Sequence, residues 1–438
     1  MERLSRPRFF YGWIVAACAF AVMFTAYGVQ YAFGVFFPAI LKEFGWTRAS
    51  LSGAFSLYTL VYTGCGFLSG RLTDYWGPRR VVALGGLMLG SGLMLLSLTH
   101  SRWQLYLFYG LIAGLGMSTA YIPCNATVVK WFVRRRGTAL GLVGSGASLG
   151  IFAIPPLASL LISRYGWHLS YLLFGAATLV LLNVLARFMY RDPKELGLQP
   201  DGGSQPINPL KPMVGGKTPG PRAVEMDVSD AIRTPAFWCL TASMVAALFT
   251  IPIPYVHLVS HAQDLGLPPM VASTFISMIG ASALVGNLSL GPASDRIGRK
   301  ATLGICLFLA VLAFLGFGKA QTASGLYAAA VAFGLYYGAA AISFPAIVGD
   351  FFGREHAGAL TGIIFALGGP AVALGPVVAG WIYDRTGGYY LAFLLSAMVS
   401  AAALVILVFA RAPENHPAVG WEDTTTDEGC VGKGRGGS

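Results

Sequence analysis

Two long apolar runs are separated by Gly70-Arg71-Leu72-Thr73-Asp74-Tyr75-Trp76-Gly77-Pro78-Arg79-Arg80, a short charged stretch punctuated by glycine. The same order of Gly, Asp, Gly and two basic residues returns at Gly291-Pro292-Ala293-Ser294-Asp295-Arg296-Ile297-Gly298-Arg299-Lys300. Asp74 corresponds to Asp295 with an offset of 221 residues, and the same offset relates Pro155 to Pro376. A period that holds at distant positions predicts two copies of one unit joined head to tail.

The composition is that of a membrane protein. Of the 438 residues, 55% are hydrophobic and only 11% are charged, against roughly 25% charged in an ordinary soluble domain. Crossing a bilayer takes about 20 residues per helix. Apolar runs fall at 11–38, 50–70, 81–99, 103–129, 137–163, 168–190, 235–262, 270–291, 301–318, 323–348, 358–383 and 389–411. Because backbone polar groups find no water in lipid, the sequence predicts an all-α membrane protein with twelve transmembrane helices, six in each half.

The net charge of +11 could suggest nucleic acid as a partner, but the arrangement of the charges excludes it. With the N-terminus inside, nearly all of the 30 Lys and Arg residues fall in short loops or tails on one side of the membrane. The exceptions are Lys42, Arg48, Arg102, Arg164, Lys319 and Arg385. The positive-inside rule therefore predicts a multi-pass protein of the cytoplasmic (inner) membrane with both termini in the cytoplasm.

The runs and the stretches between them predict four segments. Residues 1–190 form an N-terminal six-helix bundle and 235–411 a C-terminal one. A polar cytoplasmic linker rich in Pro and Gly spans 191–234, and 412–438 is a disordered cytoplasmic tail. Five of the six cysteines lie in apolar runs without CxxC or His spacing, so neither disulfides nor a zinc site is implied, and no cofactor is expected.

The repeated loop resembles the signature of the major facilitator superfamily, G-x-L-x-D-R-x-G-R-[RK] between spans 2 and 3, with a weaker copy between spans 8 and 9. The resemblance covers about residues 10–411 and implies two six-helix bundles that work by alternating access. It also implies cytoplasmic ion pairs that hold one state closed, formed by Asp74 with Arg71 and Arg79 or Arg80, and by Asp295 with Arg296 and Arg299. The alternative is a solvated loop that only sets topology.

A second motif resembles the monocarboxylate transporter family and its bacterial relatives. It is Trp131-Phe132-Val133-Arg134-Arg135-Arg136-Gly137-Thr138-Ala139-Leu140-Gly141, an aromatic pair and a basic cluster followed by small residues at the start of span 5. Members that carry lactate or oxalate usually have an arginine in span 8 that pairs with the carboxylate, and here Asn287 stands in its place. The lysine that some members carry in span 1 is replaced by the neutral Gln30 and Tyr31.

The solute therefore has to be held by neutral polar side chains, or be neutral itself, since a buried cation is costly and is kept only for function. Tyrosine hydroxyls and amides can donate to a carboxylate, and tyrosine rings can stack on a planar solute. The candidates are Tyr27, Gln30, Tyr31, Tyr121, Asn125, His257, Asn287, Tyr336 and Tyr337. Each could instead be satisfied by a hydrogen bond between helices.

Two histidines in span 7 are candidates for proton coupling. His257 and His261 are four residues apart, just after Pro252-Ile253-Pro254, and Asp264 follows. Histidine is the side chain that ordinarily titrates near neutral pH. We expect His257 to bind a proton with the solute and Asp264 to tune His261 near the outer surface. The alternative is a histidine bonded to a backbone carbonyl that the prolines leave free.

The sequence therefore predicts a secondary transporter of a small organic solute, a monocarboxylate or related organic anion, coupled to protons. The alternatives are a porter of a neutral or aromatic compound, such as a vitamin or a drug-like molecule, and a membrane sensor without flux. No G-x-S-x-G elbow, phosphate-binding loop or H-E-x-x-H helix supports an enzyme. The expected partners are the lipid bilayer, the solute and a proton, and we expect a monomer.

Overall fold

The computed structural model describes residues 10–202, 226–353 and 356–411, and these residues are helical nearly throughout. The N-terminal half contains α1 (Gly12–Phe44), α2 (Arg48–Gly64), α3 (Gly66–Trp76), α4 (Pro78–Leu96), α5 (Arg102–Leu105), the π-helix η1 (Tyr106–Ala113), α6 (Gly114–Met117), α7 (Tyr121–Trp131) and α8 (Arg136–Ala186). The short 3₁₀ turns η2 (Pro193–Leu196) and η3 (Pro200–Gly202) follow it. No strand occurs within the described ranges, which confirms the all-α class.

The C-terminal half begins with α9 (Val228–Arg233) and continues through α10 (Pro235–Thr250), α11 (Pro252–Asp264), α12 (Pro269–Ile297), α13 (Arg299–Lys319), α14 (Ala323–Phe352), α15 (Ala357–Thr386) and α16 (Tyr390–Phe409). The apolar run at 235–262 is thus divided into α10 and α11 at Ile251, directly before the Pro-Ile-Pro sequence. Proline lacks the N–H that would continue the helical ladder, which accounts for a boundary at this point.

Ten of the described helical segments are long and apolar enough to cross a membrane, or eleven if α2 and α3, bent by 43°, count as one span. At 51 residues, α8 is more than twice the length that one crossing needs. Gly166 interrupts it with φ 76° and ψ 166°, a conformation that is not helical and that only glycine adopts easily. The two arms of α8 match the separate runs predicted at 137–163 and 168–190, while the count of twelve stays a prediction.

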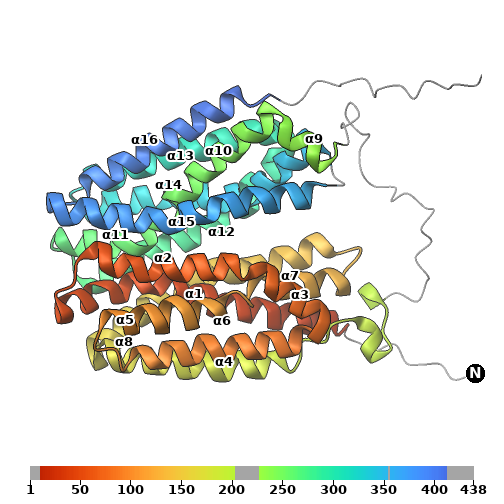
Figure 1. Ribbon diagram of the computed structural model, residues 1–438, viewed down its shortest axis with the longest axis horizontal. Helices are drawn as coiled ribbons and strands as arrows, with labels where there is room; N and C mark the ends of the chain where they lie inside the picture. The colour runs from red at the N-terminus through yellow and green to blue at the C-terminus, as the bar shows by residue number, and fades with distance from the viewer. Residues whose placement is uncertain (1–9, 203–225, 354–355, 412–438) are drawn as a thin grey trace, which may run out of the picture.

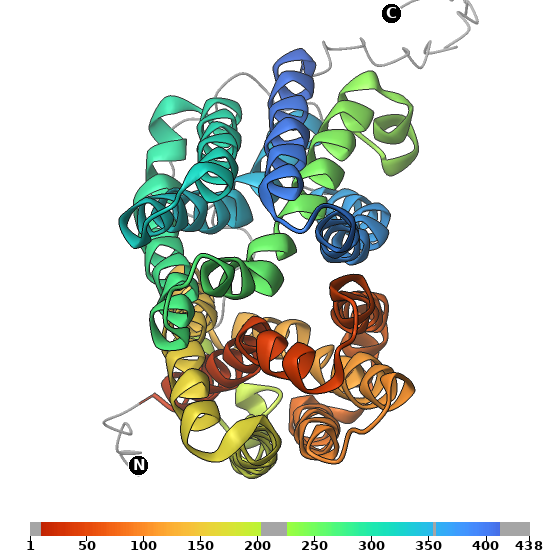
Figure 2. The same cartoon turned by 90° about the vertical axis from the view of Figure 1, so that its left-hand side faces the viewer.

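The two halves lie one above the other with their helices along a common direction (Figure 1). The left of this view, which we call the Arg48 end, holds the start of α2 and the ends of α11 and α15. The right, which we call the basic end, holds the 71–80 and 130–136 loops and the start of α13. Figure 2 looks onto the Arg48 end. The most extensive contacts between the halves are those of α2 along α15, α8 along α12, and α1 against α11.

Small residues set the closest helix approaches. Within the N-terminal half, a Cβ on Gly150 of α8 would overlap the backbone carbonyl of Phe24 in α1. Between the halves, a Cβ on Gly380 of α15 would lie 2.8 Å from the backbone nitrogen of Ala49 in α2. Glycine at such positions lets two helix backbones come into contact, as the four-residue spacing of small residues is known to do in membranes.

We expect Gly150→Ala to lower the thermal unfolding temperature of the purified protein in detergent, because the added methyl overpacks the contact between α1 and α8, at a cost of about 1–3 kcal/mol. Gly141→Ala is the matched control. It lies on the same helix, and a Cβ added there would have no neighbouring atom within 4 Å, so the gain in helix propensity should leave stability unchanged or raise it. Equal unfolding temperatures for the two variants would contradict this packing.

Candidate functional site

Arg48 joins the two halves at the Arg48 end. Its Nη2 donates to Asp264 Oδ1 of α11 at 2.9 Å, and its Nη1 donates to the Tyr389 hydroxyl at 2.7 Å. The guanidinium carbon also lies 3.6 Å from the ring centroid of Tyr383. Because only 14% of the Arg48 side chain is exposed, these contacts are partly removed from water and are worth more than a surface ion pair.

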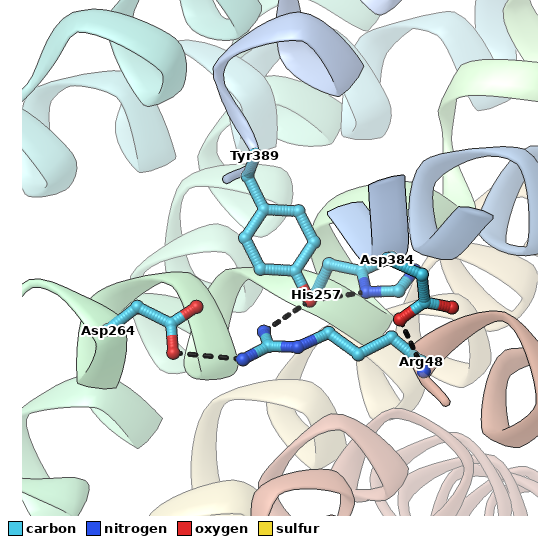
Figure 3. Close-up of polar contacts among 5 residues, drawn as sticks. All are labelled: Arg48, His257, Asp264, Asp384 and Tyr389. Carbon is cyan, nitrogen blue, oxygen red and sulfur yellow. Dashed lines mark hydrogen bonds and ion pairs between the residues drawn. The ribbon is translucent and has the colours of Figure 1, made fainter. Parts of the chain in front are cut away.

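A second contact between the halves is made by Asp384 at the end of α15. Its two carboxylate oxygens accept the backbone N–H groups of Arg48 and Ala49, each at 2.9 Å. These groups belong to the first turn of α2, where helical N–H groups have no partner of their own and the helix dipole favours an anion. The N-terminal half therefore supplies a cation and the free N–H groups of α2, and the C-terminal half supplies the carboxylates that bind them (Figure 3). We call Arg48, Asp264, Asp384 and Tyr389 the Arg48 clasp.

His257 extends the clasp into the interior. It is fully buried, and its Nε2 lies 2.9 Å from the backbone carbonyl of Pro376 and 3.2 Å from Ser52 Oγ. Since a carbonyl only accepts, Nε2 carries the hydrogen. In the neutral ring Nδ1 is then an acceptor, and it takes the hydroxyl hydrogen of Tyr389 at 2.9 Å. The Tyr389 hydroxyl thus donates to His257 and accepts from Arg48.

Asp264 and His261 do not hydrogen-bond to each other in the structure, and the tuning of His261 by Asp264 stays a prediction. The Asp264 carboxylate binds Arg48, whereas His261 Nε2 donates to the backbone carbonyl of Phe317 at 2.9 Å. His261 also packs edge-on against the rings of Tyr389 and Phe393. Both histidines thus bond to a backbone carbonyl, as the alternative interpretation of the sequence proposed. The carbonyls come from other helices rather than from the turns around the prolines of α11.

Four tyrosines meet deeper between the halves, and we call Tyr27, Tyr31, Tyr255 and Tyr337 the tyrosine cluster. The hydroxyl groups of Tyr31 in α1 and Tyr337 in α14 lie 3.3 Å apart. The ring of Tyr255 in α11 lies 3.9 Å from that of Tyr31 and 5.7 Å from that of Tyr337, between centroids. Tyr27 follows along α1, 6.3 Å from Tyr31. Three of the predicted solute residues are therefore brought together, and Tyr255 joins them.

The other predicted solute residues are distributed around this cluster. Tyr121 is half exposed, and Asn125 Nδ2 donates to the Tyr121 carbonyl one turn earlier at 2.9 Å. Tyr336 is fully buried and packs on Phe333 within the C-terminal half, 5.6 Å between ring centroids. Gln30 Oε1 and Asn287 Oδ1 are buried atoms without a hydrogen-bond partner in the part of the chain that the structure describes.

The basic end shows ion pairs of another kind. In this structure Asp74 binds Lys130 Nζ at 3.3 Å. The pairing with Arg71, Arg79 or Arg80 that the signature implies for a closed state stays a prediction. Arg79 donates to the backbone carbonyl of Arg187 and stacks on Tyr190, and Arg71 and Arg80 are exposed. In the second copy Arg299 binds Asp350 at 3.0 Å and Arg296 is exposed, while the Asp295 side chain lies outside the described residues.

Both of these ion pairs connect helices within one half. Asp74 and Lys130 belong to the N-terminal half, and Arg299 and Asp350 to the C-terminal half. Among the described residues, the only ion pair between the halves is that of Arg48 with Asp264 at the opposite end. The molecule is therefore clasped at one end, and no described ion pair joins its halves at the other.

Sequence reasoning misses the clasp because it counts Arg48 only as one of the few basic residues away from the cytoplasmic side. A signal is nevertheless present. Arg48, Asp264 and Asp384 are charged residues at the ends of spans 2, 7 and 11, and the predicted topology places all three at the same membrane surface. Opposite charges that gather at one end of a bundle are candidates for a contact between helices.

These features define a class of protein: two helical halves with a duplicated charged loop, closed by polar contacts at one end, around a polar region between them. The sequence model of the Major Facilitator Superfamily matches residues 18–289 and 238–429 of this chain. It is 30% identical to monocarboxylate transporter 13 of Bos taurus over 415 residues, covering 93% of this chain and 91% of that protein. It is 28% identical to monocarboxylate transporter 12-B of Danio rerio over 419 residues, covering 91% and 87%.

Two solved structures show the same fold. The nucleoside transporter NupG superposes with a TM-score of 0.70 at 14% identity, covering 91% of this chain and 99% of the other. A bacterial homolog of the human lysosomal transporter Spinster, in an inward-facing and unoccupied conformation, gives a TM-score of 0.68 at 16% identity, covering 91% and 95%. The chain belongs to the major facilitator superfamily, with monocarboxylate transporters among its relatives. It is a membrane transporter of small organic solutes, not an enzyme.

We expect Asp384→Asn to shift the molecule towards opening at the Arg48 end. The amide keeps one acceptor oxygen and places its own N–H₂ against the N–H groups of α2, and hydrogen bonds to a charged group are worth about 1.5–3 kcal/mol each. The population of the open form should rise at least about tenfold. Spin labels on cysteines placed at 102 and 319, both exposed positions at this end, would report a longer distance.

The matched control for this experiment is Arg385→Gln. Arg385 is the neighbouring exposed charge and stacks on Trp381 of its own helix at 4.2 Å, so its removal should leave the junction between the halves intact. An unchanged distance distribution in Asp384→Asn, or an equal change in Arg385→Gln, would show that the carboxylate of Asp384 does not hold the halves together.

Proposed function

We propose that this transporter carries a small organic anion, a monocarboxylate or a close relative, together with a proton, by alternating access. The observation that carries the proposal is the clasp, which joins a closed end of the bundle to a fully buried histidine through an unbroken set of hydrogen bonds. The monocarboxylate transporters among the relatives support the class of solute. We further propose that the protein is a monomer in the inner membrane with both termini in the cytoplasm.

The charges of the loops indicate at which membrane surface the molecule is closed. The basic end holds the 71–80 and 130–136 loops, so the positive-inside rule assigns it to the cytoplasm and assigns the Arg48 end to the outer surface. The conformation is then one that is closed outside, with residues 1–190 and 235–411 acting as two bundles around the solute. The signature loops, with Asp74 and Arg299, would act as the cytoplasmic gate in the other state.

His257 can couple a proton to the opening of the Arg48 clasp, the gate at the outer surface. In the clasped state the neutral ring accepts the Tyr389 hydroxyl at Nδ1, while Arg48 donates to the oxygen of that hydroxyl. A proton on Nδ1 would turn this acceptor into a donor, leave the Tyr389 hydrogen without its partner, and add a charge beside the guanidinium of Arg48. Protonation therefore disfavours the clasp, and a state in which the clasp is broken binds the proton better.

The solute site is proposed between the halves at the tyrosine cluster, because the Tyr31 and Tyr337 hydroxyls meet there across the two halves. Tyrosine hydroxyls can donate to a carboxylate, and they could keep these hydrogen bonds in both conformations of the transporter. The partnerless atoms of Gln30 and Asn287 are further polar groups that a solute could satisfy. Tyr121, half exposed on α7, would form the cytoplasmic side of the site.

A neutral or aromatic solute is the second candidate, and one observation favours it. The tyrosine cluster offers ring faces and hydroxyls, and the span-8 position that usually carries arginine is Asn287. A planar compound could stack in place of the contact between Tyr31 and Tyr255 without the need for a cation. The two candidates differ in whether transport depends on a negative charge on the solute.

We expect proteoliposomes containing the protein to take up radiolabelled lactate or pyruvate when an inward proton gradient is applied. Stimulation by the gradient should be lost in His257→Gln, because glutamine keeps hydrogen-bonding capacity but cannot carry the proton. His168→Gln is the control: His168 lies at the same end, 3.5 Å from Glu43, but more than a third of its side chain is exposed. Its uptake should remain that of the parent.

The other outcomes are equally informative. Lactate uptake that appears only in Asn287→Arg would show that the fold is shared and the natural solute is different. Neutral and aromatic compounds would then be screened in the same vesicles. Saturable binding without counterflow would indicate a sensor, and gradient-stimulated uptake retained by His257→Gln would place proton coupling at another group.

A further inference from the structure

A cavity of about 310 Å³ lies beside the clasp, between α1, α2 and α11. Its polar lining consists of Lys42 at the end of α1, Arg48 at the start of α2, and Ser260, Gln263 and Asp264 near the end of α11. The cavity is separate from the tyrosine cluster, none of whose members lines it. Because it contains the cation of the clasp, whatever binds in it has direct access to the ion pair that holds the halves together.

The charge inside this cavity is unbalanced. Two cations, Lys42 and Arg48, face one carboxylate, Asp264, which is already bound by Arg48. In the described part of the chain Lys42 makes no ion pair. The neighbouring Glu43 does not neutralise it, since its carboxylate accepts from Trp167 Nε1 at 2.6 Å and lies 3.5 Å from His168. An anion would restore the balance.

A buried hydroxyl in the same cavity also lacks a partner. Ser260 is 2% exposed, and its Oγ makes no hydrogen bond within the described residues. Buried polar groups are bonded in the great majority of cases, so an unpaired one calls for an explanation. A bound acceptor would satisfy it, with the side-chain amide of Gln263 available beside it. The remaining walls are the apolar side chains of Pro38 and Leu41, which suit a short carbon chain.

We infer that this cavity is a binding site for a small organic carboxylate arriving at the outer surface, held by Arg48, Lys42 and Ser260. The planar guanidinium fork of Arg48 matches a carboxylate in a way that no neutral side chain does. Arg48 would thereby supply the cation that position 287 lacks. This inference rests on the proposed function, because it names the group of the organic anion that the protein recognises first.

The site would also link arrival of the anion to the opening of the gate. A carboxylate that binds Arg48 competes with Asp264 for the same N–H groups and so exchanges one ion pair for another. The ion pair that breaks joins the two halves, whereas the one that forms holds the solute. An anion that binds the unclasped arrangement better than the clasped one shifts the population towards the open state by that difference in affinity.

The test is protection of a single cysteine. In a full-length chain whose six native cysteines are replaced by alanine, Gln263→Cys provides a thiol in the cavity, and its reaction with a neutral maleimide is followed in detergent solution. Lactate should slow the labelling, while neutral lactamide and chloride at equal ionic strength should not. In Lys42→Gln the half-protecting lactate concentration should rise at least about tenfold, because the anion no longer has the charge-assisted hydrogen bond from the ammonium.

Two further variants complete the design. Ser260→Ala removes the unpaired hydroxyl and should also weaken protection, although the clasp stays intact. Lys319→Gln removes an exposed cation at the same end, outside the cavity. In this variant lactate should protect the thiol at position 263 as it does in the parent. Both Lys42 and Lys319 are exposed, so their variants should fold. No protection by lactate, or protection that is the same in Lys42→Gln, Ser260→Ala and the parent, would overturn the site.

Failure of the site and failure of the proposed function give different results. Protection by lactate without proton-driven uptake would keep the carboxylate site and reject monocarboxylate transport. Proton-driven uptake of lactate without protection at position 263 would keep the function and reject the site. Protection by lactamide as strong as that by lactate would assign the cavity to neutral compounds and also overturn the inference.

Discussion

The exchange of charges between α2 and the ends of α11 and α15 is the interaction on which the conformation of the molecule depends. The start of α2 needs an anion for its free N–H groups, and Asp384 provides it from the other half. The guanidinium of Arg48 in turn binds Asp264 at the end of α11. The Arg48 side chain is only 14% exposed, and a largely buried charge is costly when it loses its partner. Separating the halves therefore requires that water, a proton or an ion replace each of these partners.

His257 connects the Arg48 clasp to the interior of the molecule through hydrogen bonds. Its hydrogen bonds run from the Pro376 carbonyl of α15 to the Tyr389 hydroxyl and on to Arg48, so three helices and both halves share one hydrogen-bond network. In such a network the direction of each hydrogen is fixed by the next group. In the mechanism we propose, a proton added at the ring disturbs the contact at the guanidinium, and this change favours separation of the two bundles.

The architecture could be predicted from sequence because it rests on local and periodic features: apolar runs, the offset of 221 residues, and the Pro-Ile-Pro break. The clasp is missed, since Arg48 and Asp264 are 216 residues apart and no local pattern pairs them. The sequence assigns Asp264 to His261 because it shows only the nearest partner on the same helix. In the folded chain α2 brings a stronger one, a cation with an N–H group directed at the carboxylate.

In the site we infer, Arg48 is the physical counterpart of the span-8 arginine that Asn287 replaces. A cation in the middle of the membrane is expensive at every stage of the transport cycle, whereas one at the end of the bundle stays close to water and is paired with Asp264 until an anion arrives. Exchanging Asp264 for a solute carboxylate leaves the charge on Arg48 balanced throughout. The released Asp264, whose side chain is 34% exposed even in the clasp, can then be hydrated, so that leaving it unpaired costs little. A solute that moves inward from Arg48 to the tyrosine cluster leaves its charged partner behind. A proton carried with the solute would neutralise the carboxylate, which would then need no cation in the middle of the membrane.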